Sequence, residues 1–166
     1  MERRSIRLAA AIASGAVLLS STLALATAGS GVIDVSERGN GTTTAGVKVN
    51  VPGEIKLQAK DGLKVFDQEL SVLPGGFVGW HSHPGPVLVT VKAGTFRFQE
   101  ADCSYVDYTQ GQTFVDEGGG HVHNGRNPGA INTDLSITYL LPPGAAPRID
   151  VPAGDPRIAF AQANCP

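Results

Sequence analysis

Short stretches of alternating apolar and polar residues run along the chain from residue 47 onward. Successive side chains of a β-strand point to opposite faces, so this alternation is typical of strands with one buried face. Gly and Pro residues separate the stretches about every 8–12 residues, a spacing typical of β-sandwiches and small barrels. We therefore expect an all-β fold with no helix after the N-terminal leader. The expected strands cover residues 47–51, 55–59, 63–73 (ending at Pro74-Gly75-Gly76), 87–91, 95–99, 105–109, 113–115, a segment around 121–123, and 135–141.

The first 28 residues have a different character. Arg3, Arg4 and Arg7 precede an apolar run, and the small residues of Ala26-Thr27-Ala28 end it. This order is typical of a cleaved export signal. A retained membrane anchor is the alternative, because residues 8–28 are just long enough to span a bilayer. We expect a signal peptide over residues 1–28, a secreted or extracytoplasmic protein, and no stable membrane association after cleavage.

Three regions follow this leader. Residues 29–46 are rich in Gly, Ser, Thr and Asn, which predicts a flexible N-terminal arm. Residues 47–142 hold the expected strands, and a mature chain of about 138 residues suits a single domain. Residues 143–166 are expected to form an irregular tail, because six prolines lie between Pro142 and Pro166 inclusive.

The charge of the chain argues against one class of partner. The formal net charge is −2, and Lys and Arg residues do not cluster in the sequence. Binding of nucleic acid requires a basic face that neutralises phosphates. We therefore expect no nucleic-acid partner.

The chain contains two cysteines, Cys103 and Cys165. In an oxidising compartment, two thiols most simply form one disulfide, which here would tie the C-terminal tail to the domain. Two unpaired buried thiols are the alternative. A cysteine-based metal site is disfavoured, because no C-x-x-C spacing is present.

The four histidines form two His-x-His pairs, His81/His83 and His121/His123. Residues i and i+2 of a strand lie on the same face, so each pair can direct two imidazoles into one cavity. Imidazole is a common ligand of Zn, Cu, Fe and Ni, and two converging pairs would supply three or four nitrogen donors. A chance decoration of a surface strand is the alternative for either pair alone. Two pairs together, with no other histidine in the chain, favour a metal site.

The residues around both pairs resemble the two motifs of the cupin family. Gly75-x5-His81-x-His83-x3-Val87-x6-Gly94 is similar to the first motif, and Gly111-x5-Glu117-x-Gly119 followed by His123 and Asn127 is similar to the second. The resemblance implies a single-domain jelly-roll β-barrel of six to eight strands with a metal inside. More narrowly, the chain resembles small exported bacterial cupins, most of unassigned function.

Two departures from the family pattern affect the expected ligands. Val87 stands where the family usually has its glutamate ligand, and the second motif has Glu117 at the usual proline position and one extra residue before the histidine. Counting back from Asn127 selects His123 as the ligand, whereas counting forward from Gly118 selects His121. We expect His81, His83 and His123 to hold the metal, with His121 as a fourth ligand or a nearby base.

Asp116 and Glu117 lie close to the second histidine pair in the sequence. Either carboxylate could orient an imidazole through its second ring nitrogen. A solvated acidic turn is the alternative.

The resemblance to three-His cupin dioxygenases implies a function. The protein would be an oxidoreductase that uses a divalent transition metal, Fe(II) if it is an enzyme, with Mn, Ni, Cu or Zn as other candidates. Its partner would be a small organic substrate. The alternative is a non-catalytic cupin that binds a small ligand or the metal itself, and either form could be a homodimer.

Overall fold

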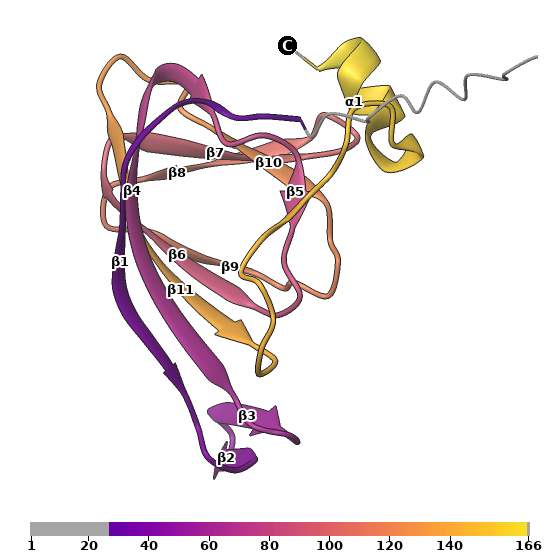
Figure 1. Ribbon diagram of the computed structural model, residues 1–166. Coiled ribbons are helices and arrows are strands. Elements are labelled where there is room, and N and C mark those ends of the chain that lie inside the picture. The colour runs from indigo at the N-terminus through magenta and orange to yellow at the C-terminus, as the bar shows by residue number, and fades with distance from the viewer. Residues whose placement is uncertain (1–26, 166) are drawn as a thin grey trace, which may run out of the picture.

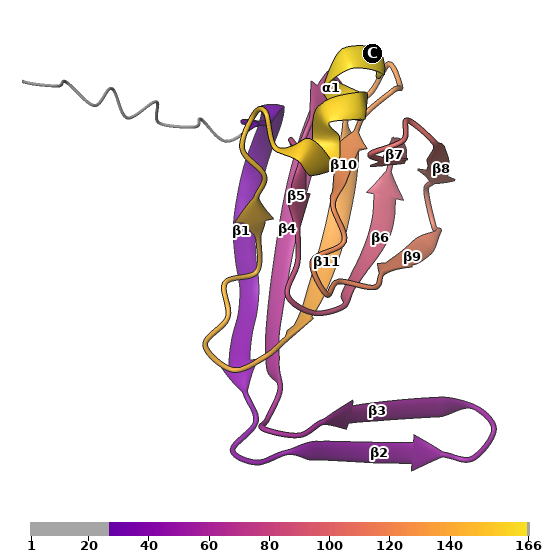
Figure 2. The same cartoon turned by 90° about the vertical axis from the view of Figure 1, so that its right-hand side faces the viewer.

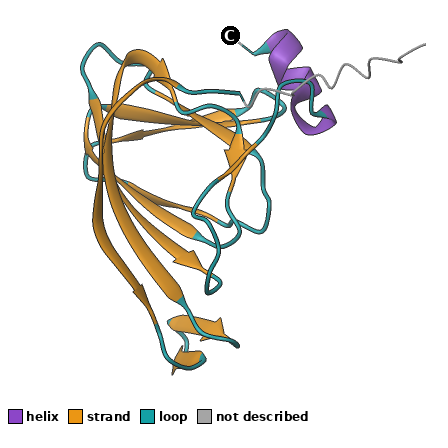
Figure 3. Ribbon diagram, viewed as in Figure 1, coloured by secondary structure: helices purple, strands orange, loops and turns teal. Residues whose placement is uncertain are grey.

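The structure is a computed structural model that describes residues 27–165 (Figure 1). The expected export signal therefore lies outside the described residues, apart from Thr27 and Ala28. Strands dominate the fold, and helix is confined to the C-terminal tail (Figure 3). Within residues 27–165, no helix is both long and apolar enough to span a bilayer. The strands are β1 (Ser30–Thr42), β2 (Val47–Val51), β3 (Ile55–Ala59), β4 (Lys64–Phe77), β5 (His81–Ser82), β6 (Val87–Ala93), β7 (Thr95–Glu100), β8 (Tyr105–Thr109), β9 (Thr113–Asp116), β10 (His123–Arg126), β11 (Thr133–Leu141) and β12 (Ile149–Asp150).

The main sheet has ten strands and curls into a barrel of two layers (Figure 1). One layer has the order β1, β4, β11, β6 and β9, and the other consists of β12, β5, β10, β7 and β8. The two layers meet where β10 pairs with the end of β4, at Arg126 and Phe77. Every one of these pairings is antiparallel. The expected all-β barrel is confirmed.

The core of the barrel follows from the alternation in the sequence. Buried and partly exposed residues alternate along the whole of β11, so that Leu135, Ile137 and Tyr139 face inward. Val87 and Val89 of β6 face inward in the same way. These side chains belong to one apolar cluster that lines the inside of the barrel.

A second apolar cluster lies under the C-terminal tail. It consists of Trp80, Val122, Val151, Ile158 and Ala161, and the last two come from a 3₁₀ turn (Pro156–Ile158) and helix α1 (Ala159–Asn164). Trp80 and Val122 each directly precede a histidine that lines the barrel cavity. The second cluster therefore supports that part of the barrel from behind.

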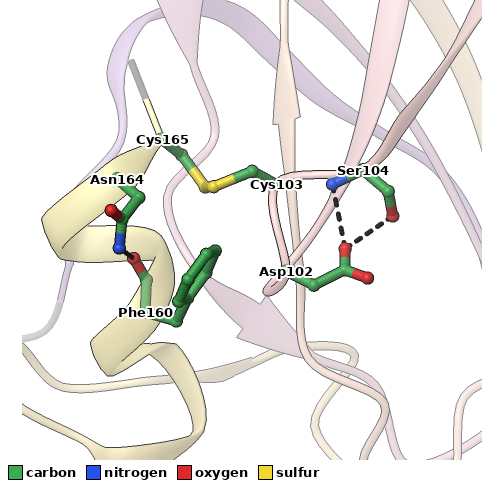
Figure 4. The surroundings of a disulfide bond; sticks show 6 residues. All are labelled: Asp102, Cys103, Ser104, Phe160, Asn164 and Cys165. Atoms are coloured by element: carbon green, nitrogen blue, oxygen red, sulfur yellow. Dashed lines mark hydrogen bonds between the residues drawn. A yellow bond between two sulfur atoms is a disulfide. The ribbon is translucent and has the colours of Figure 1, made fainter.

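A disulfide between Cys103 and Cys165 fixes this tail to the barrel, with the Cα atoms 5.4 Å apart (Figure 4). It joins the end of α1 to the turn between β7 and β8. The same turn is held by Asp102 Oδ1, which accepts hydrogen bonds from the Ser104 amide at 2.9 Å and hydroxyl at 2.6 Å. The pairing of the two cysteines agrees with the expectation from the sequence.

The N-terminal region differs from the flexible arm expected over residues 29–46. Residues 30–42 form β1, which pairs with β4 from Ser30 opposite Phe77 to Thr42 opposite Lys64. Main-chain hydrogen bonds between strands do not depend on side-chain type, and β-bulges absorb irregular residues. Three register shifts in this pairing accommodate a sequence that lacks clear alternation.

Strand β4 also continues past Pro74, where the sequence predicted its end. Leu73, Pro74 and Gly75 are exposed, and the β1–β4 register shifts between Val32 and Ser30 at the same place. Proline is tolerated in a strand at such a bulge, because no hydrogen bond between the strands requires its missing N–H there.

Two further regions correct the expected domain plan. The hairpin of β2 and β3 is a separate two-stranded sheet that projects from one end of the barrel, rather than part of it (Figure 2). The tail is not irregular throughout, because it contains β12, the 3₁₀ turn and α1. Asp155 caps the start of the turn and Pro156 occupies its first position, a combination that is a recognised helix-start signal.

Candidate metal centre

Three histidines converge on the inner face of the barrel. His123 of β10 pairs directly with His81 of β5, and His83 follows two residues after His81. One ring nitrogen from each lies within 4.8 Å of the others, and all three residues are at most 6% exposed. The structure thus brings together three of the four histidines that the sequence singled out.

Hydrogen bonds fix the orientation of two of these rings. His81 Nδ1 lies 2.7 Å from the carbonyl oxygen of Gly79, and His83 Nδ1 lies 2.6 Å from that of Pro147. A carbonyl can only accept, so each Nδ1 carries the proton and each Nε2 keeps its lone pair. Such a bond to the far nitrogen is the usual way in which proteins orient histidine ligands of metals. Pro147 belongs to the tail, so the C-terminal segment helps to position His83.

Burial keeps the three imidazoles neutral. It lowers the pKa of His81 well below its usual value, and the neighbouring His123 adds to the effect. Burial also lowers the pKa of His83. It lowers the pKa of His123 to about 4, although the carboxylate of Asp116 opposes the shift. At neutral pH each ring therefore offers a free lone pair to a metal ion.

Asp116, the last residue of β9, lies beside these rings and is 3% exposed. Its Oδ1 accepts a hydrogen bond from the Gly118 amide at 3.1 Å. Its Oδ2 lies 3.8 Å from His83 Nε2 and 3.8 Å from His123 Nδ1, both too long for hydrogen bonds. Among residues 27–165, Asp116 Oδ2 and His123 Nδ1 are the buried side-chain atoms without a hydrogen-bond partner. The alternative of a solvated acidic turn is therefore wrong for Asp116, although Glu117 is exposed.

His121 lies at the edge of this group. Its Nε2 is 2.7 Å from Glu100 Oε2, and its Nδ1 is 3.4 Å from Asp116 Oδ1. Partial burial lowers its pKa, but the hydrogen bonds with the two carboxylates outweigh that effect and raise the pKa overall. Both ring nitrogens thus have carboxylate partners. His121 shares a possible ligand group with Asp116 and His123, but not with His81 and His83.

A cavity of about 430 Å³ opens beside the three histidines. Most of its wall is apolar and comes from both layers of the barrel, with β1 contributing Val32. Its polar side chains besides the histidines and Asp116 are Gln68, Tyr139, Arg148 and Asp150. The apolar part of the wall includes Leu70, Val89, Phe96, Phe98, Phe114 and Ile137.

Gln68 and Tyr139 form a polar pair in this apolar wall, which sequence reasoning did not find. The Tyr139 hydroxyl donates to Gln68 Oε1 over 3.1 Å, and burial raises the pKa of Tyr139 to about 12. Tyr139 therefore stays protonated as a donor. The available signal was the position of Gln68, which lies two residues before the inward-facing Leu70 on the same face of the strand.

Comparison with known proteins gives structural likenesses only. No protein-family model matches the chain, and no curated protein matches it significantly. A conserved protein of unknown function from Streptococcus pyogenes is 23% identical, with 47% of this chain and 65% of that chain covered at a TM-score of 0.42.

Two other solved structures have more descriptive names. A cupin domain from Bordetella pertussis is 19% identical, with 59% of this chain and 95% of that chain covered at a TM-score of 0.42. A protein with a double-stranded β-helix domain from Klebsiella pneumoniae is 17% identical, with 65% of this chain and 85% of that chain covered at a TM-score of 0.45. Cupin and double-stranded β-helix domains thus occur among the structural neighbours of this chain, and the cupin family is the one that its two histidine motifs resemble.

Proposed function

We propose that the protein is an exported cupin that holds a divalent transition metal at His81, His83 and His123 and binds a small organic molecule in the adjacent cavity. The observation that carries this proposal is the convergence of three buried, neutral imidazoles beside two buried polar atoms that lack partners. An unpartnered polar atom in a protein interior is costly, so its presence favours a missing cation.

The donor set fits a transition metal. Imidazole nitrogen suits Fe, Cu, Ni and Zn, whereas Mg²⁺ and Ca²⁺ prefer sites made of oxygen atoms. The Nε2 atoms of His81 and His83 would serve as donors, because their Nδ1 atoms are already engaged with carbonyl oxygens. A ring nitrogen of His123 would complete the set.

The cavity sets the kind of molecule that would bind. A volume of about 430 Å³ lies in the range of small-molecule sites, which are mostly apolar with a few placed polar groups. Neutral imidazoles leave the charge of a metal ion uncancelled, which favours a ligand with an anionic oxygen, such as an enolate, a phenolate or a carboxylate. The amide of Gln68, whose oxygen already accepts from Tyr139, keeps N–H groups free to bind a second polar atom of that ligand.

Oxygen-dependent cleavage of such a molecule is the catalytic function that we propose. A redox-active ion such as Fe(II), when bound, would supply open positions for oxygen and substrate. The three histidines would hold the ion from one side of the cavity. Phe98, which stacks on His123 with the ring centroids 4.6 Å apart, and the neighbouring Phe96 and Phe114 would help to exclude water from the site.

Non-catalytic binding of the same class of ligand is the second candidate, and one observation favours it. Two polar groups of the cavity outside the proposed metal site are poorly suited to move a proton: burial raises the pKa of Tyr139 to about 12, and Asp150 Oδ1 is bound by Arg148 Nε at 2.5 Å. These two groups therefore give little support to acid–base catalysis away from the metal site. The two candidate functions are therefore catalysis by a bound metal ion and binding of a small ligand without catalysis.

The test is metal analysis of protein purified by its own export route, followed by measurement of oxygen uptake with a panel of enolisable and phenolic compounds. The catalytic proposal expects about one transition-metal ion per chain and uptake with at least one compound. His81→Ala, prepared in the same way, is the matched control and should lose both. Bound metal without uptake, with saturable binding of a panel compound, would favour the non-catalytic candidate. Protein free of transition metal that also takes up none on addition would contradict both.

A further inference from the structure

The pairing of β6 with β9 places Asp116 directly opposite Val87. Val87 stands at the position where the first motif of the family usually has a glutamate, and it is 1% exposed. Because cross-strand partners lie about 4.5–5.5 Å apart at their Cβ atoms, a carboxylate at either position reaches the same region of the cavity. We infer that Asp116 supplies the carboxylate ligand that Val87 does not. This inference rests on the proposed metal site.

The distances support a direct role for Asp116. Its Oδ2 lies 3.8 Å from His83 Nε2 and 3.8 Å from His123 Nδ1. Ligand atoms that lie about 2.0–2.2 Å from one metal ion are separated from each other by roughly 3–3.5 Å. A shift of less than about 1 Å would bring this oxygen into a shared coordination sphere.

The other carboxylate oxygen shows how the group is oriented. Asp116 Oδ1 accepts from the Gly118 amide at 3.1 Å and lies 3.4 Å from His121 Nδ1, and His121 is held in turn by Glu100 at 2.7 Å. These contacts direct Oδ2 toward His83 and His123. They also give His121 a role as a positioning residue rather than a ligand.

Charge leads to the same assignment. Asp116 is buried and its Oδ2 has no hydrogen-bond partner in the protein, which is costly for a carboxylate oxygen. His121 touches only the Oδ1 side. A divalent ion next to Oδ2 would compensate the carboxylate, and the net charge of the filled site would be +1 rather than +2.

The test is a Co²⁺ titration of the metal-free, full-length mature protein, with its thermal unfolding measured in parallel. Asp116→Asn keeps the shape of the side chain and an acceptor for Gly118 but removes the charge. It should weaken Co²⁺ binding by more than about tenfold. Glu117→Gln, which removes the neighbouring exposed carboxylate, is the matched control and should leave the affinity unchanged. Val87→Glu combined with Asp116→Asn should restore binding.

The melting temperatures of the metal-free wild type and of metal-free Asp116→Asn show whether Asp116 is a metal ligand or a residue that stabilises the fold. If Asp116 is a ligand, Asp116→Asn replaces an Oδ2 that has no partner in the metal-free protein and keeps an acceptor for the Gly118 amide, so the metal-free variant should be about as stable as the wild type. A lower melting temperature of the metal-free variant would overturn the inference and indicate a structural role. Equal Co²⁺ affinity of wild type and Asp116→Asn would overturn it as well, while leaving the three-histidine site intact. Absence of Co²⁺ binding by the wild type would instead contradict the proposed function itself.

Discussion

His81 and His123 are direct cross-strand partners in the β5–β10 pair, and the centroids of their imidazole rings lie 4.4 Å apart. The two residues come from separate His-x-His pairs in the sequence. One backbone register therefore unites the two pairs in a single site. His83 lies in the same site because it follows His81 by two residues. His121, the other member of the second His-x-His pair, is instead hydrogen-bonded to Glu100.

This geometry predicts unequal roles for the four histidines. Replacement of His81, His83 or His123 by Ala should weaken metal binding severely, because each removes one metal–nitrogen bond. His121→Ala should cost only about 10- to 100-fold, the usual effect of a residue that positions a ligand. Titration of the four metal-free variants with Co²⁺ measures this. Equal, severe losses at all four positions would indicate a four-histidine site, and a severe loss at His121 without one at His123 would reverse the assignment.

The metal-free protein should become less stable as the pH falls below 7. The folded state holds His123 with a pKa of about 4, whereas the unfolded chain binds a proton near 6.5. The unfolded state therefore binds more protons between these values, and the stabilisation present above pH 6.5 is lost as the pH falls toward 4. For His123 alone the loss is on the order of 3 kcal/mol.

Urea unfolding at several pH values measures this dependence, with His123→Gln as the comparison. The variant should show a shallower loss than the wild type between pH 6.5 and 4. His121 has a raised pKa, so its contribution is present below about 6.5 and is lost at higher pH, which opposes the trend. Parallel curves for wild type and His123→Gln would contradict the assignment of a neutral buried His123.

Loss of the disulfide should lower stability and spare metal binding. Cys103 and Cys165 close a loop with a sequence separation of 62 residues, for which the chain-entropy model gives about 4 kcal/mol. The tail that positions His83 has its own anchors, since the Val151 amide bonds the Trp80 carbonyl at 3.0 Å and β12 pairs with β5. The double variant Cys103→Ser/Cys165→Ser should thus unfold at lower temperature while keeping its Co²⁺ affinity within a few fold. A collapse of affinity together with retained folding would show that the disulfide itself holds the site.

Strand β1 offers a test of the N-terminal region. Main-chain amides of residues 32–42 that bond to β4 should exchange slowly with solvent, as amides in a paired strand do. Amides of the projecting β2–β3 hairpin should exchange faster, because a lone two-stranded hairpin is marginally stable in water. Hydrogen exchange followed by mass spectrometry or NMR measures both segments in one sample. Exchange of residues 32–42 at the rate of an unstructured chain would restore the flexible arm that the composition predicts.

Local patterns in the sequence predicted the barrel and the convergence of His81, His83 and His123. Alternation fixes which face of β11 is buried, and His81 and His83 share a face for the same reason. Strand β1 and helix α1, which the sequence did not predict, depend on non-local contacts. Strand β1 is held by hydrogen bonds to β4, and helix α1 is held by packing against Trp80 and by the link to Cys103.

The sequence left open whether Asp116 lies beside an imidazole or in a solvated turn. It lies next to exposed Glu117 in a segment rich in glycine, which resembles an acidic surface turn. Only the register of β6 and β9 reveals that it is buried opposite Val87. A cross-strand neighbour such as Asp116 leaves no mark in a motif that is read along one strand.

The most direct test of the metal site is anomalous X-ray scattering from crystals of the protein loaded with Co²⁺ or Zn²⁺. We expect one strong peak inside the barrel, about 2.0–2.2 Å from a ring nitrogen of each of His81, His83 and His123. A peak at His121 and Glu100 instead, or no peak within the barrel of metal-loaded crystals, would contradict this expectation.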